Sequence, residues 1–126
     1  MAGETILMVE DNPLNAKLIR DVLTVKGYTV IESVTAEEGL KLAHENQPAL
    51  ILMDIRLPGM DGTAALGELK QSAATRNIPV IAVTASVMPN EQDALLAAGF
   101  DGFQPKPVNM KELIADMRML LDVAGE

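Results

Sequence analysis

The chain of 126 residues has no cysteine, no tryptophan and only three aromatic residues, two phenylalanines and one tyrosine. The lack of cysteine excludes disulfide bonds, thiolate metal sites and cysteine nucleophiles. So few aromatic rings leave little for nucleic-acid bases to stack on. No apolar run approaches the roughly 20 residues that span a bilayer, and the first residues do not resemble a signal peptide. We therefore expect a cytoplasmic protein with no membrane insertion.

The charge balance also narrows the choice of partners. Ten basic residues stand against eighteen acidic ones, which gives a formal charge of −8, and no basic cluster is visible in the sequence. Direct binding to nucleic acid is disfavoured, because neutralising phosphates dominates that affinity. The length suits one domain, so we expect a single domain over residues 1–126, with no effector domain and with proteins as partners.

Strand-like and helix-like patterns alternate along the chain. Short apolar runs rich in β-branched residues predict strands, and the segments between them have helical periodicity. The predicted strands lie near residues 5–9, 28–32, 49–53, 79–83 and 101–104. The predicted helices lie near residues 13–26, 35–45, 63–72, 89–98 and 109–122. This alternation predicts an α/β fold with a doubly wound parallel sheet.

Local signals mark several of the helix ends. Asn12 and Pro13 supply an N-cap and a first-turn proline for the first helix. Thr35 stands three residues before a glutamate, which is the spacing of a capping box. Gly27 and Gly99 stand where helices are expected to stop.

Polar residues stand at or just after the ends of four predicted strands. Glu10 and Asp11 follow the first strand, Asp54 the third, Thr84 the fourth and Lys106 the fifth. Ligands of an open parallel sheet bind at the carboxyl ends of its strands. We therefore expect these five side chains to meet in one pocket.

Three of these side chains are carboxylates, and this pattern indicates a metal site. Carboxylates held close together repel one another unless a cation is present. Oxygen ligands with room for water suit Mg²⁺, with Mn²⁺ as an alternative. Capping of the next helix explains Glu10 and Asp11 equally well when they are taken alone. Asp54, on a strand expected to lie beside the first, favours the metal site.

Asp54 is the best candidate for a nucleophile. A carboxylate beside a metal ion and a cation can attack phosphorus and form an aspartyl phosphate. Lys106 could pair with Asp54 and stabilise the incoming charge, and Thr84 could donate a hydrogen bond to a phosphoryl oxygen. A solvated lysine and an ordinary strand-ending threonine are the simpler interpretations of these last two residues.

Taken together, these motifs resemble the receiver domain of bacterial two-component response regulators over essentially the whole chain. The resemblance implies a flavodoxin-like (βα)5 fold with strand order 2-1-3-4-5. The motifs that carry it are Val9–Asn12, Leu52–Asp54, Leu57–Gly62, Ile78–Ala85 and Lys106–Pro107.

The resemblance also implies a role for each residue of the metal site. Asp54 would be the phosphoacceptor. Asp11 and Asp54 would bind Mg²⁺ together with the backbone carbonyl of Arg56, and Glu10 would contribute indirectly.

Four further residues receive roles from the same resemblance. Thr84 and Lys106 would contact the phosphoryl group. Phe103 would turn inward on activation and so act with Thr84 as the switch. The bond before Pro107 would be cis.

The function implied is that of a stand-alone response regulator, and not of an enzyme with a separate substrate. It would take a phosphoryl group from a phosphohistidine of a histidine kinase or histidine phosphotransferase, and it would catalyse only its own phosphotransfer and dephosphorylation. It would then signal to a downstream protein. The stretch 10–18 is similar to receivers of phosphorelays, so a role as an intermediate phosphate carrier stays open.

Two other classes of protein fit the sequence less well. Phosphatases of the haloacid dehalogenase type need a second aspartate two residues after the nucleophile, where this chain has Arg56. A flavodoxin-like cofactor binder needs a phosphate-binding loop rich in glycine, serine or threonine after the first strand, and this sequence has none there.

Overall fold

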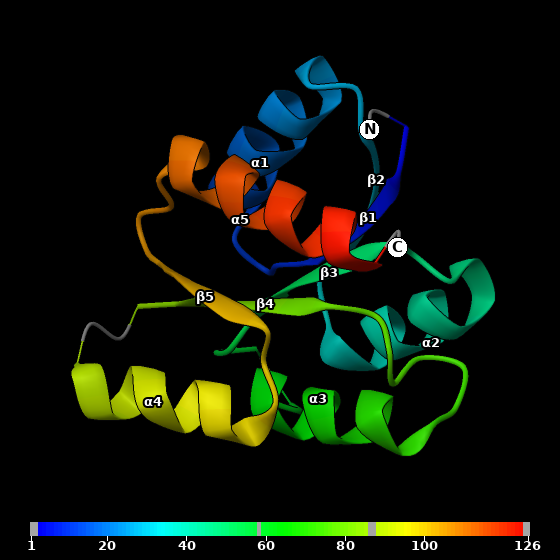
Figure 1. Cartoon of the computed structure of the whole chain (residues 1–126), viewed down its shortest axis with the longest axis vertical. Helices are drawn as coiled ribbons and strands as arrows, with labels where there is room; N and C mark the ends of the chain where they lie inside the picture. Colours follow the sequence, from blue (N-terminus) through cyan, green and yellow to red (C-terminus); the bar gives the residue numbers. More distant parts are fainter. Residues whose placement is uncertain (1–2, 58, 86–87, 125–126) are drawn as a thin grey trace.

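The computed structural model describes residues 3–57, 59–85 and 88–124, in which five strands alternate with five helices (Figure 1). The strands are β1 (Thr5–Val9), β2 (Thr29–Ser33), β3 (Leu50–Asp54), β4 (Val80–Thr84) and β5 (Gly102–Pro105). The helices are α1 (Pro13–Val25), α2 (Ala36–Asn46), α3 (Gly62–Gln71), α4 (Pro89–Ala98) and α5 (Met110–Ala124). Each predicted element is present, with ends that differ from the prediction by at most two residues.

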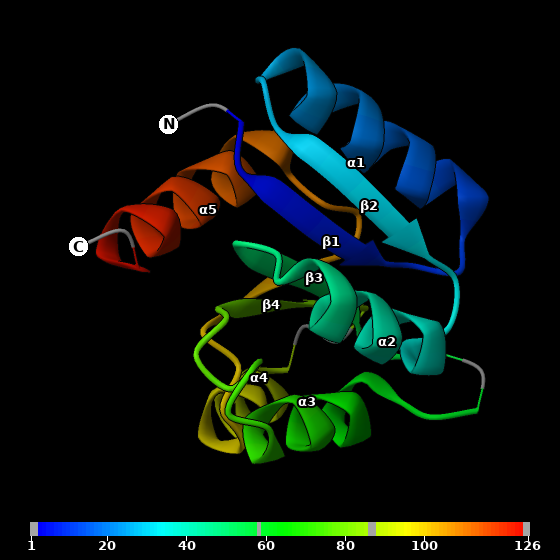
Figure 2. The same cartoon turned by 90° about the vertical axis from the view of Figure 1, so that its right-hand side faces the viewer.

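The strands form one parallel sheet in the order β2-β1-β3-β4-β5. Helices α1 and α5 cover one face, and α2, α3 and α4 cover the other (Figures 1 and 2). This is the predicted flavodoxin-like arrangement. β1 and β3 are neighbours, so the carboxyl ends of both strands reach the same edge of the sheet.

A separate hydrophobic core lies on each face of the sheet. Alternate residues of a strand point to opposite faces, so Ile6 and Met8 pack toward α1 and α5, whereas Leu7 and Val9 pack toward α2 and α3. All five residues of β3 are buried, as expected for a central parallel strand. Each fully buried aliphatic side chain contributes roughly 1.5–3 kcal/mol, so β3 is held firmly in place.

The predicted helix caps form. The Asn12 side chain accepts hydrogen bonds from the N–H groups of Leu14 at 2.9 Å and Asn15 at 3.2 Å. The Thr35 hydroxyl accepts one from the N–H of Glu38 at 3.1 Å. Gly99 ends α4 with φ at 116°, a conformation that glycine adopts without strain.

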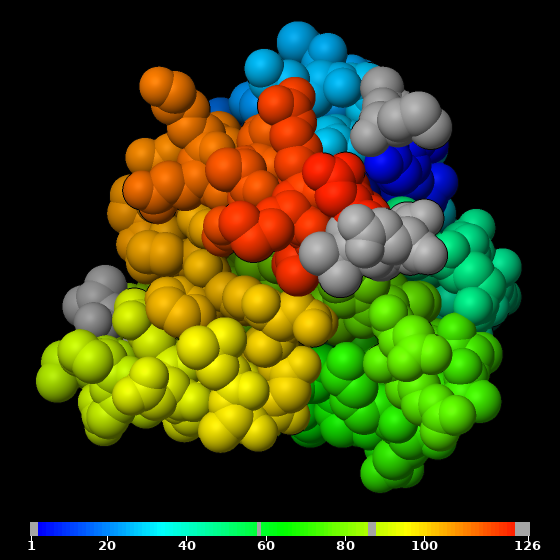
Figure 3. Space-filling model, in the orientation of Figure 1, coloured from blue at the N-terminus to red at the C-terminus, as the bar shows by residue number. Residues whose placement is uncertain are grey.

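Helices α5 and α4 form much of the molecular surface on the face drawn in Figure 3, with α5 in orange and red above α4 in yellow. α5 packs one face against the sheet and buries Leu113, Ile114, Met117 and Leu121, with Leu120 half-buried beside them. Among the described residues no helix combines the length and the apolar character that a membrane crossing requires.

Gly62 begins α3 directly against the strand that carries Asp54. A Cβ at this position would lie 2.6 Å from the carbonyl oxygen of Asp54 and 2.9 Å from Cα of Ile55. These are backbone atoms of a buried segment, so the Gly62→Ala variant must shift them. We expect its free energy of unfolding in urea to fall by about 1–3 kcal/mol.

Gly67 provides the matched control, because it lies in the same helix and a Cβ there meets no atom within 4 Å. Gly67→Ala should raise the free energy of unfolding by about 0.5–1 kcal/mol through helix propensity. Equal effects of the two substitutions would contradict the close contact at Gly62.

Candidate functional site

Three carboxylates meet at the carboxyl end of the sheet. Glu10 and Asp11 follow β1, and Asp54 is the last residue of β3. One carboxylate oxygen from each residue lies within 4.8 Å of the other two. Glu10 and Asp54 are both 3% exposed, whereas Asp11 lies at the surface. The cluster therefore meets solvent at Asp11.

Lys106 reaches this cluster from the segment after β5. Its Nζ lies 2.9 Å from Oδ2 of Asp54 and 3.4 Å from Oε1 of Glu10. The backbone holds the residue in place, because its N–H donates to the carbonyl of Thr84 at 2.7 Å. The bond to Pro107 is cis. One ammonium group thus bridges two buried carboxylates. The sequence predicted only the contact of Lys106 with Asp54.

Backbone N–H groups orient both buried carboxylates. Arg56 donates to Oδ1 of Asp54 at 3.0 Å, and Asn12 donates to Oε2 of Glu10 at 3.1 Å. The two oxygens of Asp54 therefore have different partners, an N–H on one and an ammonium on the other. The sequence pointed to neither of these bonds, since every non-proline residue carries an N–H and only the turn geometry aims it.

Thr84 and Phe103 lie on the neighbouring strands. Thr84 is the buried last residue of β4, one position beyond Val83, which pairs with Asp54 in the sheet. Phe103 is half-buried in β5 and packs against the core on the α2, α3 and α4 side. The structure thus brings Thr84 to the sheet edge of the carboxylates. Phe103 pairs with Ala82, two positions before Thr84, and so lies farther from that edge.

Burial and charge alter the acid–base behaviour of the site. Burial, reinforced by the hydrogen bond and charge of Asp54, raises the pKa of Glu10 from 4.5 to about 7, against the opposing effect of the Asn12 N–H and of Lys106. Burial alone would lower the pKa of Lys106, but hydrogen bonds and charge from Asp54 and Glu10 outweigh it and raise that pKa. Lys106 therefore stays charged at neutral pH.

The donor set fits a small divalent cation. The site offers three carboxylates against a single ammonium group, so negative charge remains uncompensated when all are ionised. The ligands are oxygens, with solvent access at Asp11, and this suits Mg²⁺, which takes few protein carboxylates and keeps several waters. Asp11 and Asp54 are placed to hold such an ion.

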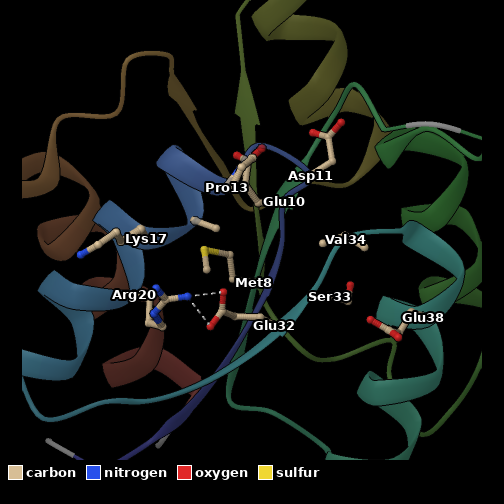
Figure 4. A pocket seen from close by; sticks show the side chains of 11 residues that line it. Met8, Glu10, Asp11, Pro13, Lys17, Arg20, Glu32, Ser33, Val34 and Glu38 are labelled. Atoms are coloured by element: carbon tan, nitrogen blue, oxygen red, sulfur yellow. Dashed lines mark hydrogen bonds and ion pairs between the residues drawn. The ribbon is translucent and has the colours of Figure 1, made fainter.

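A pocket of about 610 Å³ adjoins the carboxylates, between α1 and the segment from β2 into α2. Glu10 and Asp11 line it together with Lys17 of α1 (Figure 4). Arg20 and Glu32 form an ion pair at 2.9 Å on the side away from Asp11. The acidic site thus opens onto a broad concave surface.

The raised pKa of Glu10 predicts a pH-dependent stability. The unfolded chain releases this proton near pH 4.5 and the folded protein near pH 7, so the unfolded state binds fewer protons in between. The free energy of unfolding should therefore fall as the pH rises from about 5 to 8, by up to about 3 kcal/mol. Urea unfolding of the wild type and of Glu10→Gln at several pH values across this range measures the change in the free energy of unfolding.

The free energy of unfolding of Glu10→Gln should not fall over this pH range. Equal pH profiles for the two proteins would contradict the raised pKa of Glu10. Magnesium ions should oppose this loss of stability at pH 8, because only the folded chain brings the three carboxylates together. A ligand at 100 times its dissociation constant adds about 2.7 kcal/mol.

The sequence pattern of the response regulator receiver domain matches residues 6–118 of the chain. The polar-differentiation response regulator DivK of Brucella ovis is 38% identical over 118 residues, which cover 94% of this chain and 96% of that protein. DivK of Brucella anthropi matches to the same extent.

Solved receiver structures have the same fold. The receiver domain of the sensor histidine kinase PA1611 from Pseudomonas aeruginosa superposes with a TM-score of 0.88 at 33% identity, covering 96% of this chain and 99% of that one. That structure has a magnesium ion coordinated in its active-site cleft. A CheY-like receiver from Methanospirillum hungatei superposes with a TM-score of 0.88 at 30% identity, covering 98% of each chain. Sequence and fold together show that the chain belongs to the receiver domain family of two-component response regulators.

Proposed function

We propose that Asp54 accepts a phosphoryl group from a phosphohistidine of a histidine kinase or histidine phosphotransferase. The observation that carries this proposal is the setting of its carboxylate. Asp54 is buried at the end of the central strand, with Lys106 on one oxygen, the Arg56 N–H on the other, and two further carboxylates within 4.8 Å. Members of this family act as signalling switches, and the proposal assigns the switch to this residue.

The transfer follows from this arrangement. A carboxylate oxygen of Asp54 attacks phosphorus, the P–N bond of the phosphohistidine breaks, and the electron pair leaves with the imidazole, which takes up a proton. Lys106 offsets the charge that builds on the phosphoryl oxygens. Mg²⁺, when bound, supplies further positive charge and orients those oxygens. Asp11, Asp54 and the carbonyl of Arg56 would hold it, with Glu10 contributing indirectly. Attack by water on phosphorus then breaks the bond between phosphorus and the Asp54 oxygen, which releases inorganic phosphate and returns Asp54 to its free state.

The signal leaves through a change in the protein surface. A phosphoryl group adds a charge of about −1.5 to −2 and three acceptor oxygens beside Thr84. A hydrogen bond from the Thr84 hydroxyl to one of these oxygens draws that side chain toward Asp54. Phe103 on the adjacent strand then turns inward, and the new surface meets a downstream protein in the cytoplasm.

The relatives support a role in protein-to-protein signalling. The DivK proteins are called response regulators of polar differentiation, and the alignment with this chain covers 96% of their length. The solved neighbour from Pseudomonas aeruginosa is part of a sensor histidine kinase. An output switch is our proposal, with transfer of the phosphoryl group onward to a histidine phosphotransferase as the alternative.

The acceptor is tested by Asp54→Asn, which keeps the shape of the side chain but replaces the nucleophile with an unreactive amide. Labelling by acetyl phosphate with Mg²⁺ should be abolished, because no other group takes over the attack. Asp61→Asn is the matched control, since Asp61 is an exposed carboxylate that caps α3 through a 2.8 Å hydrogen bond. It should be labelled like wild type. Labelling that persists in Asp54→Asn, for example at His44, would overturn the assignment.

The switch is tested by Thr84→Ala, which removes the hydroxyl but leaves the nucleophile and Lys106. Beryllofluoride, a phosphoryl mimic, should still bind with Mg²⁺. The amide NMR shifts that it causes in α4, β5 and the start of α5 should shrink, because the hydroxyl that moves toward the phosphoryl site is gone. Thr84→Ser keeps the hydroxyl, so beryllofluoride should cause the full amide NMR shifts in this variant. Full wild-type shifts in Thr84→Ala would contradict this route.

A further inference from the structure

A second concave surface lies between α1 and α5, away from the acidic site. This α1–α5 groove has a volume of about 360 Å³. Its lining residues are Val22, Lys26, Met110, Lys111, Ile114, Ala115 and Arg118. None of them lines the acidic pocket or contacts Asp54, so the groove needs an explanation of its own.

The groove gathers positive charge in an acidic protein. Three of the ten basic residues, Lys26, Lys111 and Arg118, line it in a chain with a formal charge of −8. All three are exposed, and within the described ranges none has a hydrogen bond or ion pair from its side chain. By contrast, Lys17 and Arg20 on α1 have carboxylate partners.

The positive charge of the groove comes from its side chains. The groove begins at Met110 and Lys111, the first residues of a fifteen-residue helix. The start of this helix is capped, because Asn109 Oδ1 accepts a hydrogen bond from the N–H of Glu112 at 3.2 Å, and Glu112 offsets the partial positive charge of the helix end. The three cations favour an anion as the ligand.

The floor of the groove is aliphatic. Val22, Met110 and Ile114 line the groove together with the basic side chains, and no aromatic residue lines it among the described residues. Leu18 precedes Val22 by four residues and Val25 follows it by three, so all three lie on the same face of α1. Leu18 and Val25 are 49% and 85% exposed, so the apolar surface continues beyond the groove. A ligand that fits this surface carries aliphatic groups as well as negative charge.

We propose that the α1–α5 groove docks an acidic segment of a partner protein in which aliphatic side chains alternate with carboxylates. Three unpaired cations complement the carboxylates, and the aliphatic floor complements the other side chains. An extended polyanion such as nucleic acid or an anionic bilayer would also face the rest of the molecule, where eighteen acidic residues stand against seven basic ones, and would be repelled. The absence of aromatic lining disfavours nucleotide bases.

The experiment is an amide NMR titration of the whole chain with a capped peptide of glutamate and leucine, Ac-EELLEELE-amide. Shifts should concentrate in residues 22–26 and 110–118 and should weaken as salt is raised. The double variant Lys26→Glu and Lys111→Glu should bind at least about tenfold more weakly, because two attractive contacts become repulsive. Unchanged circular dichroism and unchanged labelling of Asp54 by acetyl phosphate show that this variant is folded.

The matched control is the double variant Lys41→Glu and Arg76→Glu, which makes the same change in charge at exposed residues outside the groove. It should bind the peptide like wild type. Equal weakening by both double variants, shifts spread over the whole surface, or no shift in the groove at millimolar peptide would each overturn the proposal. Binding to phosphatidylglycerol vesicles that depends on Lys26 and Lys111, with no response to the peptide, would assign the groove to a membrane surface instead.

Discussion

The ammonium group of Lys106 between the carboxylates of Asp54 and Glu10 is the contact on which the site depends. Two carboxylates that are each 3% exposed cannot both stay charged in a protein interior without a compensating cation. Lys106 supplies one at 2.9 Å and 3.4 Å, and the pKa of Glu10 still rises to about 7. Loss of this cation would leave buried charge without a partner, which typically destabilises a protein strongly.

The fold places these groups through the order of its strands. β1 and β3 are neighbours, so Glu10 and Asp54 come together, and β4 brings Thr84 beside them. β5 is the edge strand next to β4, and the backbone bond from Lys106 to Thr84 directs the lysine back over the sheet. The residual repulsion at this edge costs stability, and such a cost at a functional site is a common compromise between stability and function.

The sequence was sufficient to predict the alternation of strands and helices and the edge where the polar residues meet. Asp54 and Lys106 stand at strand ends, and the geometry of a parallel sheet brings strand ends together. Contacts made by the backbone could not be predicted in this way. The Asn12 N–H on Glu10, and the approach of Gly62 to the carbonyl of Asp54, depend on turn geometry rather than on residue type. The α1–α5 groove depends on the packing of two helices that are more than eighty residues apart in the chain.

The central claim is that Asp54 carries the phosphoryl group, and chemical trapping tests it most directly. Borohydride reduces an aspartyl phosphate to homoserine, so the modified residue can be located by peptide mass spectrometry. After incubation with acetyl phosphate and Mg²⁺, the account predicts homoserine at position 54 and at no other aspartate. Reduction at Asp11 or Asp61, or protein that is phosphorylated but yields no homoserine at position 54, would contradict it.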